Sequence, residues 1–136
     1  MQEDLRSACV LRPETQLWWN QAKRDFQVAR RNHRSRDYDV AVFYSEQAVQ
    51  KALKAVILHR TERPPPKIHN LVELGRIVGV DPSMSLFLAD LAPQYIRTRY
   101  PDAAGQVTTV LFDGRTSLKF VRGVGTVMAW CRNRLR

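Results

Sequence analysis

Two arginines and two tyrosines close the fourth predicted helix of this chain, and an aspartate follows them. These residues are Tyr95, Arg97, Arg99, Tyr100 and Asp102. Arginine grips phosphate through two parallel hydrogen bonds, and tyrosine rings stack on bases. The pattern therefore fits a site that binds a nucleotide or RNA. A structural interpretation fits equally well, in which the arginines favour the helix dipole, Tyr95 belongs to the core and Asp102 pairs with Arg99.

His69 and two lysines are further candidates for chemistry. His69 lies near the start of the third predicted helix, where it either contacts the second helix or acts as a catalytic or ligand group. Lys51 and Lys54 in the second predicted helix either face a cleft or extend to water. The three histidines lack metal-ligand spacing, so we expect no metal site and no cofactor.

The net charge of +9 arises from 22 lysines and arginines against 13 acidic residues. Such a balance attracts phosphates, acidic proteins or anionic lipids, although it also fits a surface that only aids solubility. Four arginines form a basic corner where the first predicted helix ends, and this corner is either solvated or in contact with nucleic acid. They are Arg30, Arg31, Arg34 and Arg36.

The length of 136 residues fits one domain, which needs no disulfide or metal to fold. Cys9 and Cys131 have no CxxC spacing, so we expect reduced thiols in the cytoplasm. Residues 1–12 lack the apolar run of a secretory signal, and no stretch approaches the roughly 20 apolar residues of a membrane span.

Hydrophobic periodicity predicts five helices. They run from Glu14 to about Arg34, from an N-cap at Asp37 to about His59, from about His69 to Val78, from an N-cap at Ser83 to about Arg99, and from about Asp113 to Arg134. The second is apolar around most of its circumference, so we place it centrally.

Glycine and proline divide these helices. Gly79 is a stop signal for the third helix, Pro93 is expected to kink the fourth, and Pro101 ends it. Residues 101–112 are predicted as a loop. The expected buried faces of the third and fourth helices include Val72, Ile77 and Leu86 in addition to Leu71, Leu74, Leu88, Leu91 and Tyr95. We therefore predict an all-α, up-down antiparallel four- to five-helix bundle over 14–136, preceded by a flexible lead-in over 1–13.

Three segments carry a family resemblance. They are WNQAKRDFQVA at 19–29, YDVAVFYSEQAVQKALKA at 38–55, and KIHNL at 67–71 with YIRTRYPD at 95–102. In this order and spacing, the chain resembles the HEPN family (higher eukaryote and prokaryote nucleotide-binding domain) over residues 15–134.

The resemblance implies a helical bundle that forms a homodimer and often works with a small nucleotidyltransferase, as in toxin–antitoxin pairs. On residue type and position, the candidate nucleotide- or RNA-binding residues are Lys51, Tyr95, Arg97, Arg99, Tyr100 and Asp102. Many HEPN proteins are metal-independent RNases with an Arg-x(4–6)-His motif near the start of a late helix. There a histidine moves protons and an arginine stabilises the developing phosphorane charge.

The chain departs from that motif. With four residues between, the histidine position counted from Arg99 falls on Ala104, and no histidine follows His69. Arg63 and His69 match the motif by count, but three prolines separate them. The leading hypothesis is a dimeric nucleotide- or RNA-binding or nucleotidyltransferase-partner module that lacks the late motif. The alternatives are a metal-independent endoribonuclease that uses Arg99 with His69, and a pure protein-interaction module.

Overall fold

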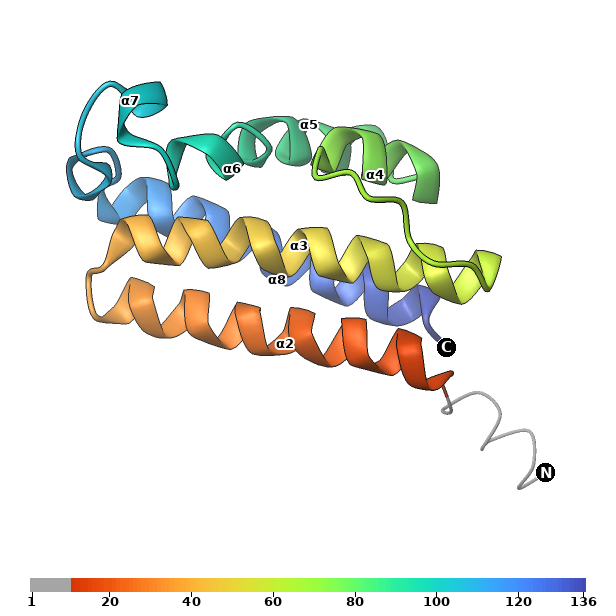
Figure 1. The fold of residues 1–136 in the computed structure, drawn as a ribbon. Coiled ribbons are helices and arrows are strands. Elements are labelled where there is room, and N and C mark those ends of the chain that lie inside the picture. The colour runs from red at the N-terminus through yellow and green to blue at the C-terminus, as the bar shows by residue number, and fades with distance from the viewer. Residues whose placement is uncertain (1–10) are drawn as a thin grey trace.

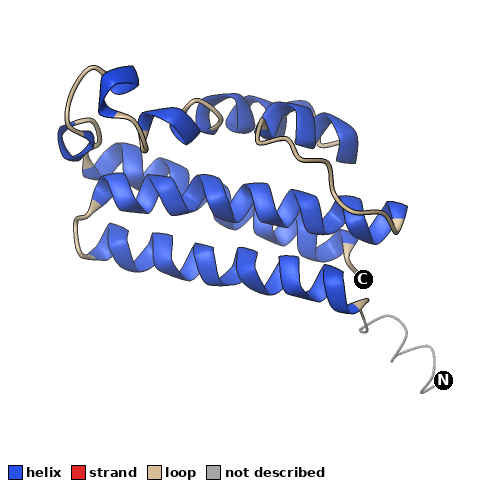
Figure 2. Ribbon diagram, in the orientation of Figure 1, coloured by secondary structure: helices blue, strands red, loops and turns tan. Residues whose placement is uncertain are grey.

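Three long helices and a series of short ones build residues 11–136, the part of the chain that the computed structural model describes (Figure 1). The long helices are α2 (Pro13–Arg34), α3 (Tyr38–Thr61) and α8 (Gly114–Arg134). The short ones are α4 (Leu71–Val78), α5 (Pro82–Leu91), α6 (Gln94–Arg97), α7 (Pro101–Ala104) and the 3-10 turn η1 (Thr108–Val110). Residues 11–136 contain no strand (Figure 2), so the all-α prediction is confirmed. Residues 1–10 of the predicted lead-in lie outside the described residues.

The helices form an up-down bundle of four rods (Figure 1). The first, second and fourth rods in chain order are α2, α3 and α8, and the third rod is divided into α4, α5 and α6. Asp25 of α2 bonds Lys51 of α3, and His33 of α2 bonds Ser117 of α8. Together with the directions of the chain, these contacts place α2 antiparallel to both neighbours. The short helices run back over α3 and α8, on the side away from α2. The predicted bundle architecture is confirmed.

Helix α3 is the centre of the bundle, as its apolar circumference predicts. Its buried apolar residues point towards α2, α8 and the short helices, because a rod enclosed on all sides needs apolar groups all round. They are Ala41, Val42, Ala48, Val49, Ala52, Leu53, Ala55, Val56, Ile57 and Leu58. Four polar residues of α3 are buried among them, and these build much of the site described below.

The helix ends follow local chemistry. Asn70 accepts hydrogen bonds from the backbone of Val72 and Glu73, so α4 begins at Leu71, two residues later than predicted. Gly79 ends α4 with a positive φ of 80°, as expected of a glycine stop signal. Asp37 holds the N-cap position of α3, but its carboxylate accepts from Ser35 Oγ and makes no cap bond.

The prediction of one continuous fourth helix is wrong. Pro93 has no N–H, so the chain leaves the helical hydrogen-bond ladder and is divided into α5 and α6. The N-cap of α5 is Asp81, which accepts from Met84 N at 2.8 Å, and not Ser83. The helical conformation ends at Arg97, and the predicted loop after it contains α7 and η1.

The predicted buried faces of the short helices are correct in part. Leu71, Leu74, Leu88 and Leu91 are buried. The predictions for Leu86, Ile77 and Val72 are wrong, since these side chains are 72%, 43% and 37% exposed. The short helices cover α3 and α8 with one side only, so their outer apolar residues have no layer above them. Within the described residues, no helix has the length and apolar content to cross a membrane.

Candidate functional site

Four side chains from three parts of the sequence stack in one column against α3. The ring of His69 is nearly parallel to the ring of Tyr95, with centroids 4.8 Å apart. The guanidinium carbon of Arg99 lies 3.8 Å from the Tyr95 centroid and 4.5 Å from the Phe43 centroid. Arg99 Nη1 also donates to the Tyr95 carbonyl at 2.5 Å. The column therefore brings together both residues that the sequence suggests for catalysis, with Tyr95 between them.

Tyr95 is the member of the column that contacts two of the others, because Arg99 and His69 both lie against its ring. The column touches α3 at Phe43 through Arg99 and at Gln50 through His69, two positions seven residues and about 10 Å apart along the helix. Tyr95 is half-buried and His69 is exposed.

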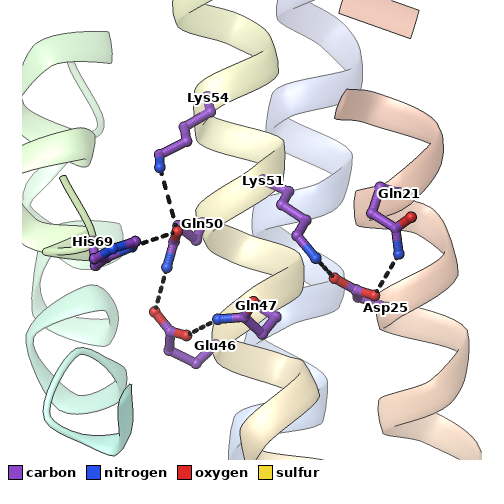
Figure 3. Close-up of polar contacts among 8 residues, drawn as sticks. All are labelled: Gln21, Asp25, Glu46, Gln47, Gln50, Lys51, Lys54 and His69. Carbon is purple, nitrogen blue, oxygen red and sulfur yellow. Dashed lines mark hydrogen bonds and ion pairs between the residues drawn. The ribbon is translucent and has the colours of Figure 1, made fainter. Parts of the chain in front are cut away.

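A buried polar chain supports the column from beneath (Figure 3). Gln50 donates from Nε2 to Glu46 Oε2 at 3.1 Å, and its Oε1 accepts from Lys54 Nζ at 3.4 Å and from His69 Nδ1 at 3.0 Å. Gln47 donates to the other oxygen of Glu46 at 2.7 Å. Glu46, Gln50 and Lys54 recur every fourth residue, so they share one face of α3.

This chain of contacts fixes the proton of His69. A lysine ammonium only donates, so the side-chain oxygen of Gln50 faces Lys54, and its amide nitrogen faces Glu46. The oxygen that faces Lys54 also faces His69, and because it can only accept a hydrogen bond, Nδ1 of His69 must carry the hydrogen that is donated to it. In the neutral imidazole, the lone pair is consequently on Nε2.

Burial shifts the protonation of both ionisable groups in this chain. It raises the pKa of the fully buried Glu46 carboxyl, against the effect of hydrogen bonds from Gln47 and Gln50 and of the Arg99 and Lys51 charges. Burial also lowers the pKa of Lys54, and the Glu46 charge counters that shift. Lys54 Nζ lies 5.6 Å from the Trp18 ring centroid, on the surface that α2 presents. The two groups stabilise each other's charged forms across Gln50.

Lys51 belongs to a separate contact on another side of α3 (Figure 3). Its ammonium lies 2.6 Å from Asp25 Oδ2, and Gln21 donates to Asp25 Oδ1 at 2.9 Å. The Asp25 side chain is 3% exposed and that of Lys51 is 24% exposed. The pair therefore links α2 to α3 and does not join the stacked column.

A surface cavity of about 350 Å³ opens beside the column, lined mostly by apolar groups. Its walls are His69, Asn70, Ala92, Pro93, Tyr95 and Ile96. The Oδ1 atom of Asn70 accepts from the backbone of α4, which fixes this side chain with its amide hydrogens unused by the cap. The cavity thus combines flat apolar walls with an amide donor and the edge of an imidazole.

The other predicted binding residues lie apart from this cavity. Arg97 packs 5.7 Å from the Phe112 centroid and contacts Gln94 at 3.4 Å. Tyr100 and Asp102 are exposed. Within residues 11–136, no ion pair joins Asp102 to Arg99, so the architectural pair considered from sequence is absent. Arg97 and Arg99, although only two residues apart, therefore contact different neighbours.

Sequence reasoning missed Glu46 and Gln50 as parts of the site, and Asp25 as the partner of Lys51. The available signal was a polar residue at every fourth position of α3, within a helix that is otherwise apolar all round. As to metals, the described residues bring no three His, Cys, Asp or Glu side chains together in a way that would hold an ion.

Comparison with known proteins agrees with the helical bundle fold. The family model described as "HEPN domain" matches residues 15–134. No curated protein matches. Among solved structures, TT1696 from Thermus thermophilus superposes with a TM-score of 0.83 at 23% identity, over 90% of this chain and 99% of that one. ST0689, an archaeal HEPN homologue, superposes with a TM-score of 0.77 at 21% identity, over 90% and 98%. These likenesses establish the fold.

Proposed function

This chain belongs to the HEPN domain family, and from that membership and the cavity beside His69 we propose that it binds single-stranded RNA or a nucleotide at this site. The observation that carries the proposal is the largely apolar cavity at the open end of the His69, Tyr95 and Arg99 column. Flat apolar walls with a few fixed polar groups suit a nucleobase.

Each wall of the cavity has a role in this proposal. A base enters between Ile96 and Pro93, and its polar edge meets the amide of Asn70 and Nε2 of His69. Arg99 uses one N–H on the Tyr95 carbonyl, and its other donors are suited to a phosphate. Lys51 is paired with Asp25 and supports the fold of the site from behind. Arg97, Tyr100 and Asp102 contact a longer strand beyond the first nucleotide.

The test compares two exposed apolar residues changed in the same way. Ile96 is 50% exposed in the cavity wall, and Leu86 is 72% exposed on α5. Ile96→Glu should weaken binding of a fluorescein-labelled RNA 10-mer by roughly 10- to 100-fold, the worth of one stacked base. Leu86→Glu brings the same charge and should bind within about twofold of the wild type. Equal affinities of the two variants in fluorescence anisotropy would reject the proposed cavity.

A metal-independent endoribonuclease is the second candidate, because the fixed tautomer leaves a lone pair on His69 Nε2. In that reaction His69 takes the proton of a ribose 2′-hydroxyl, whose oxygen attacks phosphorus and displaces the 5′-oxygen. Arg99 offsets the phosphorane charge, and a second donor from water or from across a dimer protonates the leaving oxygen. This candidate ranks second because Arg99 packs on Tyr95 and Phe43 and is not among the residues that line the His69 cavity.

Incubation of chelator-treated protein with single-stranded RNA separates the two candidates. Cleavage that yields 2′,3′-cyclic phosphate ends and disappears in Arg99→Ala and His69→Ala would favour the enzyme. Binding without cleavage, weakened steeply by salt, would favour the binding module.

We also propose that the chain self-associates through the exposed apolar residues between α6 and α8. Val107 and Val110 are each 65% exposed. Exposed apolar groups in one segment mark an interface. We expect sedimentation equilibrium to show a homodimer for the wild type and a monomer for the double variant Val107→Glu with Val110→Glu. Leu17→Glu is the control, since Leu17 is 70% exposed on α2. If the wild type is a monomer and forms a complex only when a small nucleotidyltransferase is added, this surface would instead be the binding site for that partner.

A further inference from the structure

The outer side of α2 ends in a group of arginines that the proposed RNA site does not use. Arg30, Arg31 and Arg34, together with Gln27, line a surface cavity of about 340 Å³. All four side chains are at least partly exposed. Each of them donates hydrogen bonds, and only the Gln27 oxygen accepts. The cavity therefore presents three fixed positive charges with no carboxylate in its lining.

No carboxylate within residues 11–136 pairs with these arginines, although Arg30 lies 5.6 Å from the centroid of the Phe26 ring. The sequence contains no acidic residue between Asp25 and Asp37, and both Asp25 oxygens are engaged by Lys51 and Gln21. Among the ion pairs within residues 11–136, none includes an arginine of this cavity. Like charges three and four residues apart destabilise a helix. The helix dipole favours cations in the last turn of α2, but it gives no reason for a hollow lined by them.

We propose that this arginine cavity binds the phosphodiester backbone of a nucleic acid without reading its bases. Guanidinium groups bind phosphate oxygens through paired hydrogen bonds, and these three stand on adjacent turns of one helix. A lipid surface would require apolar anchors. Within residues 11–136 the large exposed apolar residue of α2 is Leu17, at the opposite end of the helix.

The arginine cavity lies on the far side of the bundle from the His69 cavity. Helix α2 covers α3 and α8 from one side, and α6 covers them from the other (Figure 1). The inference stands independently of the proposed base-binding function, because a backbone site accepts duplexes as well as single strands.

The test is the salt dependence of binding to a fluorescently labelled 20-base-pair DNA duplex. The variant Arg31→Gln with Arg34→Gln removes two charges from the cavity. The control Arg132→Gln with Arg136→Gln removes two exposed charges at the end of the chain. Loss of two phosphate contacts should reduce the slope of log K against log salt by about 1.8, and the control should leave it nearly unchanged.

Three outcomes would overturn the proposal. The first is an equal loss of slope in both variants, which would indicate only the net charge. The second is no loss in either variant when circular dichroism shows both to be folded. The third is competition by polyglutamate as effective as that by unlabelled duplex at equal charge, which would indicate an acidic protein partner. Ile96→Glu should keep the wild-type slope on the duplex, so failure of the base-binding proposal is recognised separately.

Discussion

Two glycines of α8 should respond to the same substitution with opposite signs. A Cβ atom at Gly123 would lie 2.0 Å from Cε1 and 2.3 Å from Cζ of the Phe87 ring. Ordinary carbon contacts are about 3.5–4.0 Å, so the ring must move by roughly 1.5 Å. Overpacking of this kind costs about 1–3 kcal/mol, whereas alanine gains about 1 kcal/mol of helix propensity. We therefore expect Gly123→Ala to lower the free energy of unfolding by about 1 kcal/mol.

At Gly125 the nearest atom to an added Cβ is Phe26 Cζ, at 3.5 Å. This is ordinary contact, so Gly125→Ala should keep the propensity gain and raise the free energy of unfolding by about 1 kcal/mol. Urea titration followed by circular dichroism measures both values. Combining Gly123→Ala with Phe87→Leu should recover most of the loss. Stabilisation by Gly123→Ala alone would show that Phe87 does not hold α5 against α8 at this point.

Three further predictions concern buried ionisable groups. The pKa of Glu46 is higher in the folded state than its ordinary value of 4.5. The contribution of this group to the free energy of unfolding is therefore complete below pH 4.5 and is lost as the pH rises through the folded-state pKa. The wild-type free energy of unfolding, measured relative to Glu46→Gln, should therefore fall as pH rises above 4.5, and a flat difference would contradict this. Asp25→Asn should cost about 1–3 kcal/mol because it leaves the Lys51 ammonium unpaired in a position that is only partly exposed, and urea titration tests this. Burial raises the pKa of Cys131 to about 12, so in a Cys9→Ser background iodoacetamide should react with it at about pH 8 only at the rate of unfolding.

The long helices could be predicted from the sequence because their signals are redundant. In α2 and α8, apolar periodicity and a terminal signal agree, with Pro13 at the first turn of α2 and Asp113 capping α8. The broken third rod was harder to predict. Pro93 was expected to kink a helix, yet whether proline bends or ends one depends on the packing of both halves. The pair Asp81 and Pro82 is the stronger start signal, since aspartate at the N-cap commonly precedes proline at the first helical position.

The candidate site could be predicted only in outline. The sequence indicates Tyr95, Arg99 and His69, but it does not reveal that Arg99 and His69 both pack against the Tyr95 ring. That arrangement depends on the path of residues 62–70, which carry no periodicity from which a position can be inferred. The sequence also suggests an equal role for Arg97 and Arg99. The short α6 helix turns them towards Phe112 and Phe43 respectively, and such rotation is set by tertiary contacts.

Stability alone does not explain the polar chain beneath the column. Burying Glu46 and Lys54 incurs a desolvation cost that their separation by Gln50 offsets only in part. Apolar residues of similar volume at these positions are often neutral or stabilising in proteins. These polar side chains provide a fixed hydrogen-bond acceptor for His69 Nδ1, which an apolar core would not provide. Since the His69 ring closes the column and lines the cavity, fixing its proton fixes which hydrogen-bonding atom that cavity presents. The buried Glu46 and Lys54 side chains are therefore better explained by the hydrogen-bonding pattern of the His69 cavity than by the stability of the bundle.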